Sequence, residues 1–345
     1  MSLDVPVGME MAGYVNRKGV SKGFLKPLEA FCVLLEDEGI NLAILTFDIL
    51  GIPDGFPCII SGWKTIPVAT HTHSAPVPSK IKNELLNTSS KLIGKAKNNL
   101  YDVKEILFEK FKVKGVCAQR RKDESIDELK GYMIHIKSLK NVSFVIFPCH
   151  PTVLGPENLF YSPDLAGAIR QELSKMFNSE VIYMNSCAGD VSTRKTRRAR
   201  NEKEIERLSK MFACNMNVLY SKSITPKIED FREIFVSLKT IKKSSEKIDE
   251  ETKTALKLLA FRKNADGKIL RMCSFKLGGI PFVFHPFEMF YKRCKELDIP
   301  LIGYACSYGS YLVPNDAKDG YEWIASPYPS STEQNIVNLI KDLIR

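Results

Sequence analysis

The sequence of 345 residues predicts an α/β fold, in which helices flank a mixed or largely parallel sheet. Apolar runs of strand length, such as VSFVIFPCHP, are nearly continuous and rich in β-branched residues, as buried strands are. Longer segments with helical spacing of apolar residues alternate with these runs, which is typical of α/β architectures. Polar residues follow several strand-like runs, so we expect the active site at the C-terminal ends of the strands.

Strands and helices alternate through the first two thirds of the chain. The predicted strands are NLAILTFDILGI (41–52), the run ending in IPVAT (66–70), YMIHIKSL (132–139), VSFVIFPCHP (142–151) and EVIYMN (180–185). The predicted helices are SKIKNELLNTSSKLIGKAKNNL (79–100), SPDLAGAIRQELSKMF (162–177) and NEKEIERLSKMFACNMNVLYSKS (201–223). In the second helix, Ser162 is the expected N-cap and Pro163 the expected first helical residue.

The last third continues the same alternation. We expect a strand, a turn and a helix in IPFVFHPFEMFYKRCKEL (280–297), a strand and a loop in PLIGYACSYGSYLVP (300–314), and a closing helix in TEQNIVNLIKDLIR (332–345). Residues 222–270 are open to two interpretations, an inserted helical hairpin or an added lobe. Because the sequence contains no internal repeat and no low-complexity linker, we expect residues 1–345 to form a single catalytic domain.

The composition is that of an ordinary globular protein, with 44% hydrophobic and 26% charged residues. No apolar run reaches the ~18 residues of a membrane span, and the N-terminus lacks the basic and apolar regions of a signal peptide. Nine cysteines lie scattered in apolar segments without a C-x-x-C pair, which favours reduced, buried thiols over disulfides or a zinc finger. We therefore expect a cytoplasmic protein.

The net charge of +10 is compatible with attraction to nucleic acid, anionic lipid or an acidic substrate. Its densest part is TRKTRRARNEK, residues 193–203, for which a solvated loop is the plain interpretation. The functional alternative is attraction of an anionic substrate or lipid headgroup, so peripheral contact with a membrane stays open. Since no nucleic-acid-binding module is visible, we expect no specific binding of nucleic acid.

Two of the five histidines, His71 and His73, lie one residue apart in IPVATHTHSAPVP. Prolines end regular structure there, and alternation along an extended chain puts both imidazoles on the same side. Such a pair suits a divalent metal ion, whereas the alternative is a polar loop whose histidines only contact water.

Other predicted strand ends carry chemistry-bearing residues: His150 in PCHPT, Asp190 and Ser192 in CAGDVS, His285 and Glu288 in HPFEMF, and Tyr308 and Tyr311 in CSYGSYLVP. Histidines, a carboxylate and a nearby serine are the groups that a catalytic zinc site requires. Each also has a structural interpretation. His150 could be a buried imidazole bonded to backbone, Glu288 a helix N-terminal carboxylate, and Gly189 a residue of unusual backbone conformation.

In their order and spacing, these segments resemble the catalytic domain of the neutral/alkaline, non-lysosomal ceramidases. The correspondence runs through MAGYVN, TFDILGI, THTHSAP, PCHPTVLG, YSPDLAGAI, GDVS, YGSYL and GYEWIASPY, nearly from end to end. The sequence departs from the family after GDVS, where Thr193 and Arg194 follow. From its end at Arg345 we expect no C-terminal immunoglobulin-like domain.

The resemblance implies a zinc ion held by four ligands: His71, His150, Glu288 and Tyr311. Tyr311 is preferred to Tyr308 because its ten-residue spacing to Tyr321 is nearer the family's separation. The implied catalytic residues are Ser192, His73, Arg120 and Tyr321, with Ser192 either a nucleophile or a hydrogen-bond donor.

We therefore expect a zinc-dependent hydrolase that cleaves the amide bond of a small N-acyl substrate, such as ceramide, another N-acylated lipid or an N-acylated sugar. In that case the protein acts in sphingolipid or other lipid metabolism. Zinc with an open coordination position lowers the pKa of bound water to about 7 and polarises a carbonyl group. The alternatives from other classes are a metal-bound scaffold without catalysis and a basic nucleic-acid-binding protein.

Overall fold

The computed structural model describes residues 1–121, 127–246, 249–261 and 268–345. Its largest sheet is mixed and has the strand order β11-β9-β8-β6-β13, formed by Glu180–Asn185, Val142–Phe147, Glu128–Lys137, Glu105–Lys114 and Asn217–Ile224. Only the β9–β11 pair of this sheet is parallel. The mixed form of the predicted sheet is therefore confirmed.

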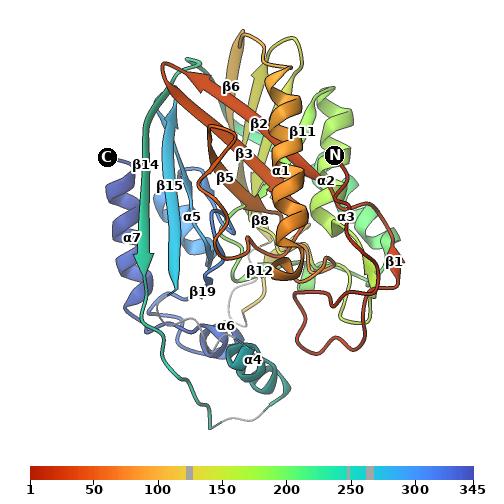
Figure 1. Cartoon of the computed structure of the whole chain (residues 1–345). Helices are drawn as coiled ribbons and strands as arrows, with labels where there is room; N and C mark the ends of the chain where they lie inside the picture. Colours follow the sequence, from red (N-terminus) through yellow and green to blue (C-terminus); the bar gives the residue numbers. More distant parts are fainter. Residues whose placement is uncertain (122–126, 247–248, 262–267) are drawn as a thin grey trace.

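Two four-stranded sheets accompany it (Figure 1). The first has the order β2-β3-β5-β4, formed by Ala30–Asp37, Ile40–Phe47, Trp63–Ala69 and Ile59–Ile60. The second has the order β14-β15-β16-β18, formed by Ile228–Ser237, Ile269–Leu277, Ile280–Phe284 and Leu301–Ile302. An isolated bridge between Val68 and Ala305 joins the neighbourhoods of these two sheets.

Three short pairs of strands complete the β-structure: β1 with β10 (Gly23–Phe24, Phe160–Tyr161), β7 with β12 (Ala118–Gln119, Val191–Ser192) and β17 with β19 (Phe287–Met289, Ser310–Leu312). The helices are α1 (Lys82–Lys97), α2 (Asp164–Phe177), α3 (Glu202–Asn215), α4 (Glu250–Phe261), α5 (Tyr291–Leu297), α6 (Gly320–Ala325) and α7 (Thr332–Leu343). Two 3-10 turns, η1 (Pro78–Ile81) and η2 (Thr193–Lys195), precede α1 and follow β12.

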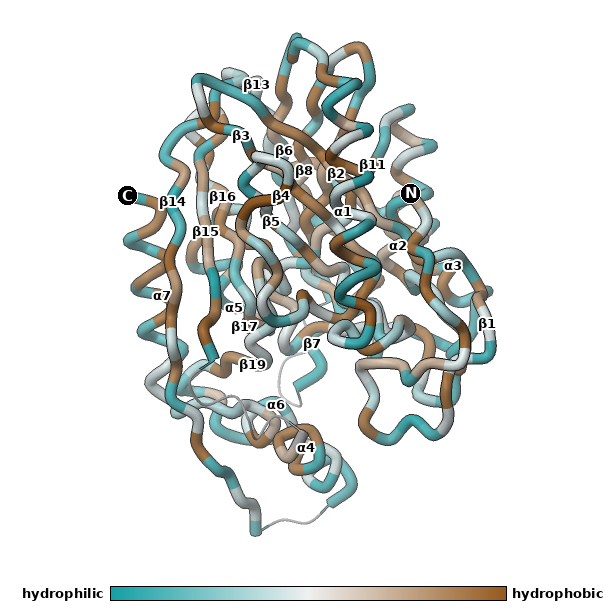
Figure 2. Tube along the Cα trace, in the orientation of Figure 1, coloured by the Kyte–Doolittle hydropathy of each residue, from teal (hydrophilic) through white to brown (hydrophobic). Residues whose placement is uncertain are grey.

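The sheets pack face to face, and helices cover their outer faces. One apolar cluster contains Ile44 and Val68 of the first four-stranded sheet, Ile134 of the five-stranded sheet, and Phe275 and Phe284 of the second four-stranded sheet. Other apolar clusters join α1 to β3, and α2, α3 and α7 to the sheets beside them. Because the central strands are buried on both faces, their sequences are nearly continuously apolar. Figure 2 shows this as hydrophobic colouring along these strands.

Most predicted elements are confirmed, with two local corrections. Helix α2 begins at Asp164 rather than Pro163, and the Ser162 hydroxyl accepts the backbone N–H of Asp164 at 3.0 Å. The helix predicted over 201–223 ends at Asn215, and the following residues form strand β13. This strand is exposed except at Ile224, so its side chains carry no burial pattern, and its pairing with β6 decides its conformation.

Residues 222–270 are not a pair of helices within the part that the structure describes. They include the end of β13, all of β14 and helix α4, which packs against α6 (Figure 1). The sequence did not reveal β14 because its partner β15 begins only at Ile269, 32 residues after β14 ends at Ser237.

The expectation of reduced thiols throughout is wrong for two of the nine cysteines. A disulfide joins Cys117 and Cys149, whose Cα atoms are 6.1 Å apart although 32 residues separate them in the chain. Cys117 lies just before β7 and Cys149 just before His150, so the bond ties together two segments that lead into the site described below. No helix in the described ranges has the length and apolarity needed to cross a bilayer.

Candidate metal centre and active site

Three histidines that follow strands converge on one point. The ligand nitrogens of His71, His73 and His150 lie within 4.8 Å of one another, and the Nε2 atoms of His71 and His73 are 3.3 Å apart. His71 follows β5, and His150 follows β9 and bridges to Ser192. The predicted grouping of histidines beyond the carboxyl ends of the strands is what the structure contains.

Backbone carbonyl groups fix two of these imidazoles. The Nδ1 atom of His71 is 2.6 Å from the carbonyl oxygen of Leu50, and Nδ1 of His150 is 2.6 Å from that of Ala188. Because a carbonyl oxygen can only accept, Nδ1 carries the proton in both rings, and each neutral ring presents a lone pair at Nε2. This is the arrangement of metal-ligating histidines, whose second nitrogen is held by an acceptor.

A buried carboxylate faces these lone pairs. Glu288 lies in β17, with Oε2 3.1 Å from Nε2 of His150 and 3.5 Å from Nε2 of His71. Burial raises the pKa of Glu288, but the positive charge and N–H groups that His71 and His150 carry when protonated outweigh burial, so that this pKa lies well below its ordinary value. Burial, and then the charge of Arg120, lower the pKa of His150 to about 4.

The donor set therefore fits a divalent cation. At neutral pH a neutral His150 and an ionised Glu288 would bring lone pair against lone pair, an arrangement that repels unless a cation or a proton lies between them. Two imidazole nitrogens and a carboxylate oxygen are ligands that zinc accepts. The Tyr304 hydroxyl and Nδ1 of His73 add buried polar atoms with no hydrogen-bond partner in the described part of the chain.

Tyrosines surround this cluster on one side. Tyr304 stacks on His71 with ring centroids 3.9 Å apart, and the Tyr308 hydroxyl donates to Oε1 of Glu288 at 2.5 Å. Tyr311, the tyrosine expected as a ligand, pairs with Glu288 in the β17–β19 register, and its hydroxyl accepts from Arg120 at 3.1 Å. Burial, and then the charge of Glu288, raise the pKa of Tyr311, so its hydroxyl stays protonated.

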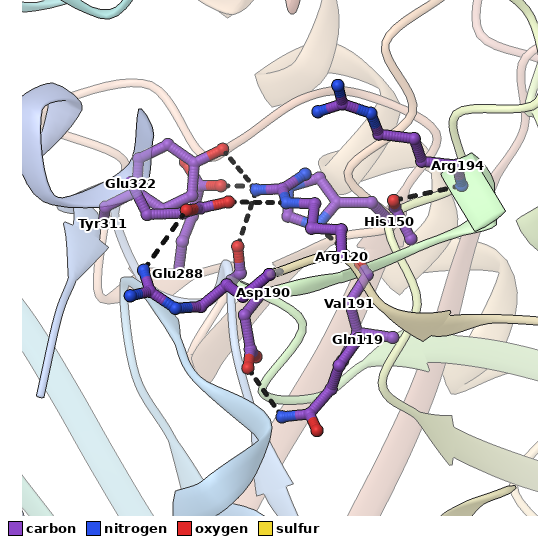
Figure 3. Close-up of polar contacts among 12 residues, drawn as sticks. Gln119, Arg120, His150, Asp190, Val191, Arg194, Glu288, Tyr311 and Glu322 are labelled. Carbon is purple, nitrogen blue, oxygen red and sulfur yellow. Dashed lines mark hydrogen bonds and ion pairs between the residues drawn. The ribbon is translucent and has the colours of Figure 1, made fainter. Parts of the chain in front are cut away.

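Arg120 is held rigidly beside the cluster (Figure 3). Its Nε donates to Glu322 at 2.7 Å, and its Nη2 donates to the carbonyl oxygen of Gly189 at 2.6 Å as well as to Tyr311. Although burial lowers the pKa of Arg120, Tyr311 and Glu322 outweigh burial and raise it, so a fixed positive charge lies next to His150.

Ser192 and Tyr321, the remaining predicted residues, line the cavity that His73 and His150 also line. The Ser192 side chain is buried, and its oxygen accepts the backbone N–H of Arg194 at 3.2 Å. No hydrogen bond between described residues joins this oxygen to a base. Tyr321, on α6, packs its ring edge against Tyr311 with centroids 6.0 Å apart.

The site opens into a cavity of about 1960 Å³. His73, Arg120, His150, Ser192, Tyr311 and Tyr321 contribute to its lining. One part of the lining is apolar and comes from the residue before α5, the segment before α6 and α6 itself: Phe290, Pro314, Trp323 and Ile324. Another part is basic and comes from the turn after Ser192. A large amphipathic molecule therefore has access to the histidine cluster.

Position 189 requires glycine because its backbone lies very close to strand β17, and not because its φ angle is positive. A Cβ atom at this position would lie 2.6 Å from the carbonyl oxygen of Glu288 and 2.9 Å from that of Met289. Its backbone N–H also donates to Met289 at 2.7 Å. The structural interpretation of Gly189 as a residue of unusual conformation is therefore wrong, because the glycine permits contact with β17.

His285, quoted with Glu288 in the same motif, lies outside the cluster. Its Nδ1 accepts the backbone N–H of Phe287 at 3.3 Å, and burial lowers its pKa to about 3. The sequence reasoning also missed Tyr304 and Glu322. Tyr304 follows the short strand β18, a position that could have singled it out, whereas only the three-dimensional contact with Arg120 identifies Glu322.

Comparisons with known proteins agree with this architecture. No family model and no curated protein matches the sequence. The crystal structure of neutral ceramidase from Pseudomonas aeruginosa matches with a TM-score of 0.74 and 14% identity, over 99% of this chain and 72% of that one. A structure described as ceramidase complexed with C2 matches with the same TM-score and identity, over 100% and 73% of the two chains. The resemblance predicted from the motifs is thus confirmed at the level of the fold.

Proposed function

We propose that this protein is a metal-dependent hydrolase that cleaves amide bonds of N-acyl compounds. The observation that carries the proposal is the meeting of two backbone-fixed imidazole lone pairs with a buried carboxylate at the end of a large cavity. The likeness in fold to neutral ceramidases supports the same class of reaction. In this reaction water adds its oxygen to the carbonyl carbon, the C–N bond breaks, and the nitrogen takes up a proton.

The metal ligands that we propose are His71, His150, Glu288 and, on the strength of the resemblance, Tyr311. A bound zinc ion supplies Lewis acidity towards water and towards the amide carbonyl. His73 lies on the cavity side of the cluster, and burial, followed by the neighbouring imidazoles, holds its pKa well below the ordinary value. We assign to this neutral ring the task of orienting water by accepting its hydrogen bond.

Negative charge develops on the substrate's carbonyl oxygen during hydrolysis, and a fixed hydrogen-bond donor or positive charge stabilises it. The guanidinium of Arg120 is immobilised by Glu322 and Gly189, and its bond to Tyr311 polarises the hydroxyl of that tyrosine. Preorganised donors of this kind stabilise an oxyanion because they need no rearrangement during the reaction.

Ser192 is better suited to donate a hydrogen bond than to attack. Its oxygen already accepts from Arg194, which leaves its proton for a substrate atom, and a nucleophilic serine needs a base within hydrogen-bonding distance. Tyr321 borders the cavity beside Tyr311, where it can contact the substrate. The proposed substrates are lipid amides, among them ceramide, because an acyl chain can lie on the apolar part of the lining.

Metal content and amide hydrolysis, measured on the same preparations, test the proposal. We expect about one zinc per chain in the wild type and cleavage of N-acyl amides, with both lost in His71→Ala and His150→Ala. The matched control is His135→Ala, since this histidine lies on β8 and bonds to Ser143, away from the cluster. The proposal would be contradicted if both site variants kept the zinc content and the hydrolysis rate of the wild type. If the wild type bound zinc but cleaved no amide, the protein would be a metal-bound scaffold without catalysis.

A further inference from the structure

The basic run that follows Ser192 forms part of the wall of the active-site cavity. Arg194, Lys195, Arg197 and Arg200 line the same cavity as His73 and His150, whereas Arg198 is exposed and does not line it. Turn η2 positions the first of these residues, because the Ser192 oxygen caps it. The basic run therefore borders the cavity that contains the histidine cluster and is not only a solvated loop.

Carboxylates compensate only some of these charges. Arg194 pairs with Glu251 at 2.6 Å, and Arg200 pairs with Glu157 at 3.1 Å. Among the described residues no ion pair involves Lys195 or Arg197. The Lys195 amine instead donates to the carbonyl oxygen of Arg121 at 3.0 Å.

Arg197 is the best placed of the cations without a carboxylate partner. Its Nη1 donates to the carbonyl oxygen of Thr152 at 2.5 Å, two residues beyond His150, so the side chain is held at the site. Burial lowers the pKa of Arg197. The buried carboxylate nearby, Asp164, already accepts three backbone N–H groups. A half-buried charge without a carboxylate in ion-pairing contact is costly, and an incoming anion would relieve that cost.

Arg17 adds a second positive charge next to His73. Its Nη2 donates to the carbonyl oxygen of His73 at 2.7 Å, and no ion pair between described residues involves it. Its buried Nε has no hydrogen-bond partner in the described chain, and burial lowers the pKa of this arginine as well. Burial therefore desolvates two arginines, neither of which has a carboxylate in ion-pairing contact among the described residues.

Resting on the function proposed above, we propose that the amide substrate carries an anionic group, a carboxylate or a phosphate, on its amine portion. Arg197 binds this anion with Lys195 beside it, while the acyl chain lies on the apolar lining formed by Phe290, Trp323 and Ile324. The preferred substrate is then an acidic N-acyl lipid, such as an N-acyl amino acid, rather than the neutral ceramide.

Matched amides with one acyl chain test this preference. N-dodecanoylglycine and N-dodecanoyl-phosphoethanolamine are compared with the neutral N-dodecanoylethanolamine, each by kcat/KM. We expect the wild type to favour at least one acidic amide, and Arg197→Gln to lower the acidic-to-neutral ratio by ~10- to 100-fold, the value of a charge-assisted hydrogen bond. Arg198→Gln, from the same run but outside the cavity, should keep the wild-type ratio. An equal ratio in the three proteins would overturn the proposal while leaving amide hydrolysis intact.

A binding measurement separates this proposal from the catalytic one. Dodecylsulfonyl glycine and dodecylsulfonyl ethanolamine are sulfonamides that the protein cannot hydrolyse as amides, and calorimetry gives their Kd values. We expect the anionic compound to bind ~10-fold or more tightly to the wild type and to Arg198→Gln, but not to Arg197→Gln. Equal affinities for the two compounds would overturn the anion site. Loss of amide hydrolysis together with retained anion preference would instead count against the function alone.

Discussion

At the scale of single residues, the site is defined by where protons are held. Backbone carbonyl oxygens accept hydrogen bonds from Nδ1 of His71 and His150 and so keep the proton on that nitrogen. Oε1 of Glu288 accepts a hydrogen bond from the Tyr308 hydroxyl. The opposite faces of these groups are therefore acceptors directed at one another. Without a cation, this arrangement is locally unfavourable, because the lone pairs of two imidazoles and a carboxylate face one another in a buried site.

A Glu288→Gln variant separates metal binding from stability. The amide can still accept from Tyr308 through its oxygen, while its N–H group can donate to His150 Nε2, which the carboxylate cannot do. We expect zinc affinity to fall and, in the presence of a chelator, the free energy of unfolding to rise by ~1 to 3 kcal/mol. Thermal unfolding with chelator and with zinc measures both effects. A variant that is less stable without metal would contradict the proposed proton arrangement.

At the scale of elements, short strands carry the proposed catalytic groups, and close packing between these strands sets the geometry. The β17–β19 pair aligns Glu288 with Tyr311, while the turn before β12 lies against β17 at Gly189. In Figure 1, β12 and β19 lie towards the same end of the molecule as α4 and α6. The contact at Gly189 joins segments ~100 residues apart and is tight enough to exclude a methyl group.

Gly189→Ala tests this packing against a matched glycine. The added Cβ would meet backbone carbonyl oxygens of β17 at less than 3.0 Å, so we expect destabilisation by ~1 to 3 kcal/mol and a loss of metal binding through displacement of Glu288. Gly94→Ala in α1, where a Cβ meets nothing within 4 Å, should instead stabilise the protein by ~0.5 to 1 kcal/mol. Denaturant unfolding and zinc titration compare the two, and equal stabilities would show that the approach at Gly189 is not critical.

At the scale of the whole molecule, the packed sheets bury histidine side chains away from water. Protonating such a side chain would place a positive charge where no water can solvate it. Burial lowers the pKa of His285 to about 3, although this ring lies outside the cluster of His71, His73 and His150. In the unfolded chain its pKa returns to ~6.5. Between these values the unfolded state binds a proton that the folded state does not, so the stability due to His285 decreases as pH falls below ~6.5.

The contribution of His285 to the pH dependence of the free energy of unfolding can therefore be predicted. Between pH 6.5 and 5, His285 should contribute a decrease of up to ~1.4 kcal/mol per pH unit to the free energy of unfolding. Asp164 acts in the opposite direction, because burial raises its pKa to about 7. Comparison of the wild type with His285→Gln, both with chelator, isolates the histidine, and we expect a shallower loss in the variant. Parallel pH curves for the two proteins would disprove this contribution.

The sequence by itself determined the α/β class, most strands and helices, and the strand ends at which His71, His150 and Glu288 meet. Burial pattern and helical spacing are local properties, and polar residues after buried strands have few other roles, so these features could be predicted. The exposed strand β13 could not, because no burial periodicity marks it.

Only the tertiary structure decided which of these groups face one another. The Cys117–Cys149 bond, the Glu322 partner of Arg120, the Tyr308 contact with Glu288 and the Gly189 approach to β17 all join segments far apart in the sequence. The tautomers of His71 and His150 likewise depend on carbonyl groups brought in from other segments. Distances of this kind arise from packing of the whole chain, and no local pattern of residues encodes them.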